Sequence, residues 1–280
     1  MSAVSVGAPA SPATEAGVVR EGRGSNRRRR GPRLRYLSLL ALLVLWFVAD
    51  RADWISADTF PGPGAVWHAA VDLATSGKLT DALQVSLTRV VVGGLIGVTL
   101  GVVLGLLSGF SHLAESVLDT PLQALRAVPF TALVPIFILW LGIGEAPKIA
   151  IVAFAVFFPV YINTYAGIRS VDVKYAEVAQ VYGLTRLAVA RRVLLPGALP
   201  NILVGIRYAL ALSWISVIVA EQLNASSGIG FLLVNARQFL QVDVMFVCLV
   251  LYALLGVVTD LAYRLVERRL LVWRRGFDGA

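Results

Sequence analysis

Six runs of apolar residues, most of them about as long as the bilayer core requires, constrain the fold of this 280-residue chain more than any other feature. The runs lie at about residues 35–50, 86–109, 122–141, 147–167, 200–220 and 244–264. Hydrophobic residues make up 58% of the chain and charged residues 15%, whereas a soluble domain is roughly 45–50% apolar and about a quarter charged. The pattern predicts an all-α, polytopic membrane protein with six transmembrane helices, and it excludes a soluble enzyme.

The chain has one cysteine, Cys248, and two histidines, His68 and His112. A single cysteine excludes an internal disulfide and a cysteine-ligated zinc site, and its place within an apolar run indicates a buried thiol. Both histidines are expected at membrane interfaces, and no serine stands in the G-x-S-G motif that an intramembrane serine protease would need. We therefore expect no catalytic residue, no metal site and no cofactor.

Residues 1–33 are mainly Gly, Ala, Pro, Ser and Arg, with few large apolar side chains. Such a segment cannot bury enough surface to offset the entropy of ordering, so we expect a disordered basic tail. The four arginines at 27–30 are typical of an anchor for anionic lipid heads, and the lack of a cleavage signal after Ala49 disfavours a secretory signal. The net charge is +8, and the Lys and Arg residues responsible for it flank apolar segments, so nucleic acid is not an expected partner.

The distribution of Lys and Arg predicts the orientation of the spans. If both termini lie in the cytoplasm, eighteen of the 25 Lys and Arg residues fall on that side and five on the other. Cytoplasmic loops of membrane proteins carry such an excess of positive residues. We therefore expect both termini in the cytoplasm.

These patterns divide the chain into five parts. The expected parts are the disordered cytoplasmic tail at 1–33, a first transmembrane helix with the start of an outer loop at 34–57, an outer interfacial helix at 58–80, a core transmembrane domain at 81–265 that includes a cytoplasmic loop at 170–198, and a cytoplasmic C-terminal tail at 266–280.

Glycine recurs every four residues along the second apolar run, at positions 93, 97, 101, 105 and 109. Four residues turn an α-helix by about 400°, so these glycines stay close to one face. A stripe without side chains lets a second helix pack closely. We interpret it as a packing groove; a substrate conduit along the exposed backbone is the less favoured alternative.

The loop between the fourth and fifth runs has the pattern of two short helices joined at a glycine corner. Asp172 and Thr185 are good N-caps, Gly183 is a good left-handed helix end, and Pro196 is expected to prevent continuation of the second helix. Helices this short are not stable alone in water, so the pair must dock on something. The small side chain of Ala179 allows a partner to approach closely.

The same loop resembles a known signature. Its residues run in the order Glu177-Val178-Ala179, three residues, Gly183, nine residues, Val193, one residue, Leu195-Pro196. This spacing resembles the EAA signature, E-A-A-x3-G-x9-I-x-L-P, of the permease subunits of bacterial binding-protein-dependent ABC importers. The loop departs from it at Val178 and Val193, which are both apolar and leave the spacing intact. Further segments within 58–265 are similar to the aliphatic sulfonate, taurine and nitrate branch, among them Leu125-Arg126-Ala127-Val128-Pro129 and Val219-Ala220-Glu221.

The resemblance implies a type I ABC importer permease fold in the bacterial inner membrane. It also implies a homodimer with a shared path, two cytoplasmic ATPase subunits, and an extracytoplasmic solute-binding protein. The solute would be a small anion, an alkanesulfonate or taurine or else nitrate. Each loop at 170–198 would fit a cleft of an ATPase as a pair of coupling helices. The implied ATPase-coupling residues are Glu177, Ala179, Gly183, Val193, Leu195 and Pro196.

No phosphate-binding G-x4-G-K-[ST] motif occurs in the sequence, since Gly77-Lys78 is followed by Leu79. The chain is therefore expected to be a transport subunit without its own ATP site, driven by a partner that hydrolyses ATP. An ion-coupled secondary transporter is the alternative; it would need an essential carboxylate at mid-membrane and no ATPase. The apolar runs offer no obvious mid-span acid.

Charged residues within or beside the apolar runs are the candidates for the solute path. An arginine that faces the path would offset the desolvation of an anion, which makes Arg126 and Arg207 candidates. Glu221, near the outer end of the fifth run, is expected to gate the path or to pair with Arg237. Arg89 is expected at a span end, with its side chain reaching the interface.

Overall fold

The computed structural model describes residues 41, 44–52 and 59–273. The chain divides into two units, Met1–Leu45 and Trp46–Ala280, and the helices that follow all belong to the second. The expected tail at 1–33, half of the expected span at 35–50 and residues 274–280 lie outside the described residues. The described residues form helices and contain no strand.

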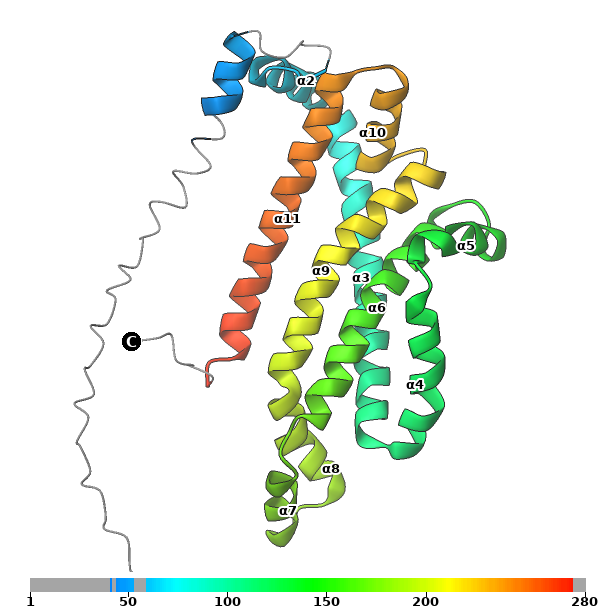
Figure 1. Ribbon diagram of the computed structural model, residues 1–280, viewed down its shortest axis with the longest axis vertical. Helices are drawn as coiled ribbons and strands as arrows, with labels where there is room; N and C mark the ends of the chain where they lie inside the picture. The colour runs from blue at the N-terminus through cyan, green and yellow to red at the C-terminus, as the bar shows by residue number, and fades with distance from the viewer. Residues whose placement is uncertain (1–40, 42–43, 53–58, 274–280) are drawn as a thin grey trace, which may run out of the picture. The chain divides into compact units, whose positions relative to one another are not determined.

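Long helices that lie side by side make up the body of the second unit (Figure 1). They are α3 (Lys78–Phe110), α6 (Glu145–Arg169), α9 (Leu195–Asn224) and α11 (Val242–Leu270). At one end of this bundle lie α2 (Pro63–Thr75) and α10 (Ile229–Gln238), and at the other α7 (Val173–Val181) and α8 (Arg186–Val189). We refer to these as the α10 end and the α7 end.

By length and composition, four of the described helices can cross a membrane. They are Lys78–Phe110, Glu145–Arg169, Arg186–Leu223 and Val242–Leu270, which correspond to the second, fourth, fifth and sixth expected spans. A bent pair of helices, His112–Ala127 with Phe130–Leu141, raises the number to five if the pair is one span. The described residues therefore do not confirm a count of six.

The expected third span at 122–141 is not one straight helix. α4 (His112–Ala127) is followed by a 3-10 turn, η1 (Phe130–Leu133), and by α5 (Val134–Leu141), with a bend of 91° between the two halves. The bend occurs because Val128 precedes Pro129, whose ring disfavours the helical conformation of the residue before it; Val128 is extended, with φ −81° and ψ 120°.

The glycine stripe of α3 packs against α6. A Cβ atom at Gly97 would lie 2.5 Å from the carbonyl oxygen of Ala153, and one at Gly101 would lie 2.8 Å from that of Phe157. Gly93, Gly105 and Gly109 meet α6 in the same way, at Val152, Thr164 and Ile168. The two backbones are therefore closer than any side chain on this face would allow, and the predicted packing groove is confirmed.

α9 packs on the same core from the other side. Val152, Val156 and Val160 of α6 contact Trp214 and Val217 of α9 in one buried apolar cluster. A Cβ atom at Gly205 of α9 would lie 2.8 Å from the carbonyl oxygen of Pro159, so this interface is also close. α6 is thus held between α3 and α9, which fixes the positions of the charged residues at both ends of the bundle.

Replacing Gly97 with alanine is expected to lower the free energy of unfolding by about 1–3 kcal/mol, because the added methyl group overlaps the backbone of α6. Gly94 is the matched control: it lies in the same helix, and no atom lies within 4 Å of a Cβ built there. Thermal unfolding of the purified protein in detergent, followed by tryptophan fluorescence, measures both variants. An equal loss in Gly94→Ala would contradict close packing as the cause.

Candidate functional site

The first half of the loop at 170–198 folds as its sequence predicts. The side chain of Asp172 accepts a hydrogen bond from the backbone N–H of Lys174 at 2.9 Å and caps α7. At the other end Gly183 has φ +78°, its N–H donates to the carbonyl of Gln180 at 2.8 Å, and the N–H of Leu184 donates to that of Ala179 at 3.0 Å. These two bonds form a Schellman motif, which ends the helix at a residue where glycine is strongly preferred.

The second half of the loop differs from the prediction. α8 passes through a π-helical turn, η2 (Ala190–Leu194), directly into α9, and Arg186–Leu223 behaves as one helix. Pro196 lies in the first turn of α9 and does not stop the helix. A proline has no N–H to donate and its ring crowds the preceding turn, and we attribute the continuity to the wider π turn, which relieves that crowding. Val193 and Leu195 therefore belong to a continuous helix.

Most of the surface of this loop faces outward. Ala179 is buried, where α7 contacts α8 and η2, while Glu177 is exposed and forms no ion pair with any described residue. Six large apolar side chains beside Glu177 are more than half exposed; we call them the α7 surface. They are Val173, Tyr175, Val178, Val181, Tyr182 and Leu187. Exposed apolar patches of this kind mark contacts with another protein or with the membrane.

A buried charge network lies at the α10 end. Arg89 of α3 donates from Nε and Nη2 to the two carboxylate oxygens of Glu145, at 2.6 and 2.7 Å. Its Nη1 donates to Glu221 Oε1 of α9 at 2.7 Å and to the carbonyl of Ser227 at 2.8 Å. Lys148 Nζ, one turn along α6, lies 3.0 Å from Glu145 Oε1. Two positive and two negative groups thus balance in one cluster.

The carboxylate of Glu221 is fully enclosed. Its side chain is 0% exposed and that of Arg89 is 1% exposed. Besides Arg89 it accepts hydrogen bonds from the Ser86 hydroxyl and from the backbone N–H of Gly230, both at 2.7 Å. The network therefore joins α3, α6, α9 and α10.

This geometry corrects two expectations. Glu221 pairs with Arg89 and not with Arg237, which is exposed and forms no ion pair with the described residues. Arg89 does not reach the interface, because the carboxylates of Glu145 and Glu221 hold it inside the bundle. A local pattern could not reveal these contacts; the available signal was an arginine inside an apolar run.

A polar cavity of about 550 Å³ adjoins this network. Its lining includes Glu145, Lys148 and Glu221, together with Gln222 of α9 and Asn235 of α10. Among the described residues no group of three His, Cys, Asp or Glu side chains could hold a metal ion. The cavity therefore offers hydrogen-bonding groups and the exposed carboxylate of Glu145 rather than a set of metal ligands.

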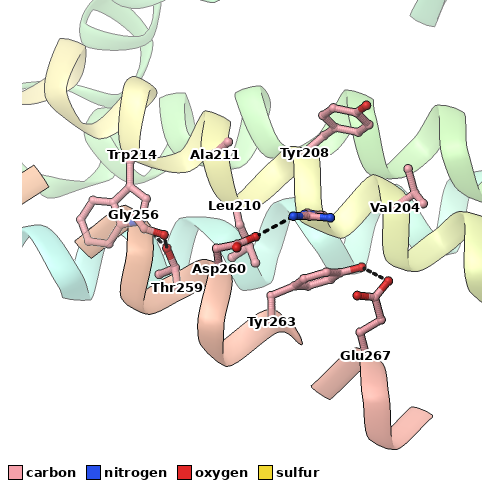
Figure 2. Close-up of a pocket in the computed structure, with 11 residues that line it drawn as sticks. Val204, Tyr208, Leu210, Ala211, Trp214, Gly256, Thr259, Asp260, Tyr263 and Glu267 are labelled. Carbon is pink, nitrogen blue, oxygen red and sulfur yellow. Dashed lines mark hydrogen bonds and ion pairs between the residues drawn. The ribbon is translucent and has the colours of Figure 1, made fainter. Parts of the chain in front are cut away.

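A second cavity, of about 660 Å³, lies between α9 and α11 and is shown in Figure 2. Arg207 lines it and its Nη2 donates to Asp260 Oδ1 at 3.1 Å. Asp260 also accepts, through Oδ2, from Arg264 Nε at 2.7 Å. Trp214 and Tyr263 contribute aromatic walls. We refer to it as the α9–α11 cavity.

The structure separates the three residues expected on the solute path. Arg207 lines the α9–α11 cavity, while Glu221 lies inside the α10-end network. Arg126 lies in the last turn of α4, where it is exposed and forms no ion pair within the described part of the chain. No described contact brings these three side chains together.

Comparisons with known proteins identify the family. Residues 97–272 match the family described as the binding-protein-dependent transport system inner membrane component. A protein of Bacillus subtilis strain 168 named as an aliphatic sulfonates transport permease, SsuC, is 42% identical over 268 residues, which are 96% of each chain. The protein of the same name in Escherichia coli K12 is 46% identical over 85% of this chain and 90% of its own. The taurine transport system permease protein TauC of that organism is 33% identical over 84% and 88%.

Solved structures show the same fold at lower identity. A chain of the MetNI methionine ABC transporter, from a structure of its inward-facing conformations, is 21% identical, with a TM-score of 0.59, over 70% of this chain and 98% of its own. A chain of an amino acid ABC transporter gives a TM-score of 0.54 at 20% identity, over 74% and 96%. With the motif of the α7–α8 loop, these findings place the chain in the family of binding-protein-dependent transport system inner membrane components, the permease subunits of ABC importers.

Proposed function

We propose that this permease imports an alkanesulfonate. The observation that carries the proposal is the 42% and 46% identity to two proteins named as aliphatic sulfonates transport permeases, over 96% and 85% of this chain. The relative named for taurine, itself an aminoalkanesulfonate, is 33% identical, so taurine is the second solute to test. Nitrate, a small anion of another class, is the third.

The α7–α8 loop is proposed to couple transport to a separate ATPase subunit. The exposed α7 surface and the exposed carboxylate of Glu177 support this role, because both are accessible to a partner and neither is used by the described part of the chain. In this scheme Glu177 contacts the ATPase, Ala179 holds α7 against α8, and Gly183 sets the corner. Val193, Leu195 and Pro196 then join the loop rigidly to α9.

The proposed assembly contains two copies of this permease, two ATPase subunits and an extracytoplasmic solute-binding protein. The α7 end would face the cytoplasm, with both termini on that side, as the distribution of Lys and Arg suggests. The α10 end, with the interfacial helix α2, would then face the binding protein. Arg126, Arg207 and Glu221 remain the proposed contributors to the path, by a direct contact with the anion or, for Glu221, by closing the outer end.

Mild extraction of the tagged chain from its native membrane tests the assembly. Mass spectrometry should find a stoichiometric ATPase subunit, and the purified complex should hydrolyse ATP in a vanadate-sensitive manner. Proteoliposomes that hold this complex and its binding protein should then take up radiolabelled butanesulfonate only with ATP at the α7 end. Competition by unlabelled taurine and nitrate ranks the three solutes.

An ion-coupled secondary transporter predicts other results. Such a chain would purify without an ATPase under several mild detergents, and its uptake would follow an ion gradient instead of ATP. The family membership does not favour this alternative. Uptake that persists without ATP would overturn the proposed coupling.

A further inference from the structure

Arg207 lies deep in its helix. It follows Leu195, the first residue of α9, by twelve positions and precedes Glu221 by fourteen. At a rise of about 1.5 Å per residue, these separations are about 18 and 21 Å. Asp260 reaches it from α11, ten residues before the end of that helix at Leu270. Within the expected spans, Arg207 lies seven residues after the start of 200–220 and Asp260 four residues before the end of 244–264. A charge that faces lipid costs about 2.5–3.5 kcal/mol at the centre of a span on insertion scales and less toward its ends.

The ion pair in the α9–α11 cavity is open, in contrast to the sealed pair at the α10 end. The side chains of Arg207 and Asp260 are 50% and 36% exposed, whereas those of Arg89 and Glu221 are 1% and 0% exposed. Charged side chains within spans generally face the bundle interior or a water-filled cavity. We infer that this side of α9 and α11 faces an aqueous space, and not hydrocarbon.

Arg207 has unused hydrogen-bonding capacity. Only Nη2 donates to a described residue, Asp260, whereas Arg89 uses Nε, Nη1 and Nη2 together. A guanidinium group carries five donors in a planar fork that matches two oxygens of an oxyanion. The free side of Arg207 therefore fits a sulfonate group, and Leu210 and Trp214 of the same cavity fit an alkyl chain. The lining also holds a second carboxylate, that of Glu267, which accepts a hydrogen bond from the Tyr263 hydroxyl at 3.2 Å.

Asp260 has a second partner, so loss of its bond to Arg207 would not leave its carboxylate unpaired. Its Oδ1 accepts from Arg207 and its Oδ2 from Arg264, at 3.1 and 2.7 Å. When Arg207 turns to an anion, Asp260 keeps Arg264, so no unpaired carboxylate remains within the span. When the anion leaves, Arg207 returns to Asp260. A transport site needs such weak, reversible binding, because a solute that binds too tightly cannot leave.

We propose that the α9–α11 cavity is a transient site for the transported organic anion, in which Arg207 exchanges Asp260 for the sulfonate group. The proposal rests on the proposed import of alkanesulfonates. The chemistry that the cavity recognises is an oxyanion on an apolar chain, and a phospholipid headgroup shares it. The experiment therefore has to separate a soluble sulfonate from a lipid.

The test measures equilibrium binding of radiolabelled butanesulfonate to the permease–ATPase complex in nanodiscs of phosphatidylcholine, without the binding protein. Arg207→Gln should weaken binding roughly tenfold or more, the loss expected for a charge-assisted hydrogen bond. Asp260→Asn should tighten binding, because Arg207 then has no competing carboxylate, and should slow ATP-driven uptake. Arg268→Gln is the control, since Arg268 lies on α11, as Asp260 does, and does not line the cavity.

Arg207→Gln is expected to weaken butanesulfonate binding and Asp260→Asn to tighten it, so misfolding cannot produce both results. Unchanged binding in Arg207→Gln, or weaker or unchanged binding in Asp260→Asn, would overturn the site. Phosphatidylglycerol is then added to the nanodiscs. If this lipid displaces butanesulfonate, and if the complex retains the lipid only when Arg207 is present, the cavity binds lipid and the proposed site is overturned. Uptake by the wild-type complex separates the two proposals. Import with binding independent of Arg207 overturns only the site. Arg207-dependent binding without import overturns the proposed function, and the cavity is then an oxyanion site with no part in transport.

Discussion

Replacing Arg89 with alanine is expected to destabilise the protein by about 3–5 kcal/mol, the loss typical of a buried ion pair that keeps only one partner. The carboxylate of Glu221 is 0% exposed, and without the guanidinium it becomes a buried charge held only by the Ser86 hydroxyl and the Gly230 N–H. The contacts of α10 with α3 and α9 depend on the same groups. Thermal unfolding of the purified complex measures the loss.

Two further variants show whether the buried charge is the cause. Glu145→Gln removes the other acidic partner of Arg89, but that side chain is 55% exposed, so the expected loss is well below that of Arg89→Ala. The double variant Arg89→Met with Glu221→Leu replaces the pair by apolar groups and should recover much of the lost stability. A melting temperature of Arg89→Ala equal to that of the wild type would contradict the network as described.

Replacing Gly183 with valine is expected to abolish most ATP-driven uptake while the chain still inserts into the membrane. Gly183 has φ +78°, a conformation that costs a residue with a Cβ about 1–2 kcal/mol and a β-branched residue more. The corner between α7 and α8 would open to relieve this strain, and the α7 surface would no longer meet the ATPase at the correct angle. Uptake and ATPase co-purification, measured on the same preparation, report the effect.

Gly183→Asn is the matched control, because asparagine tolerates the left-handed conformation at a helix end. It should keep most of the uptake. Glu177→Lys reverses the exposed charge without changing the backbone, and we expect it to abolish coupling through the contact itself. Normal uptake in both Gly183→Val and Glu177→Lys would remove the loop from the coupling mechanism.

Local patterns in the sequence predicted the parts of the fold that depend on local forces. The long helices coincide with the apolar runs, and α7 ends at Gly183 as predicted. The glycine stripe of α3 forms the predicted packing groove, which α6 occupies. The exceptions are both at prolines. Pro129 marks a 91° bend in the expected third span, whereas the helix continues through Pro196, directly after a π-helical turn.

The candidate sites were less accessible to sequence reasoning. Arg89 and Glu221 are 132 residues apart, and only the packing of α3, α6 and α9 brings them together. Arg207 could be recognised as a charge within an apolar run, but its partner Asp260 lies on another helix. The coupling role of the loop residues was predicted from their spacing, because a motif within one segment needs no tertiary contact to be recognised.

The π-helical turn joins α8 to α9 without a break, so one helix runs from the α7–α8 corner to the α10 end. The helix Arg186–Leu223 has 38 residues and is therefore about 57 Å long, with one end at the α7–α8 corner and Glu221 near the other. If that helix tilted as one body about its α7 end, a tilt of about 5° would displace the far end by about 5 Å, more than the 2.7 Å that separates Glu221 from Arg89. Motion of the α7–α8 corner would in that way reach the ion pair at the opposite end of the bundle, because both lie on one continuous helix.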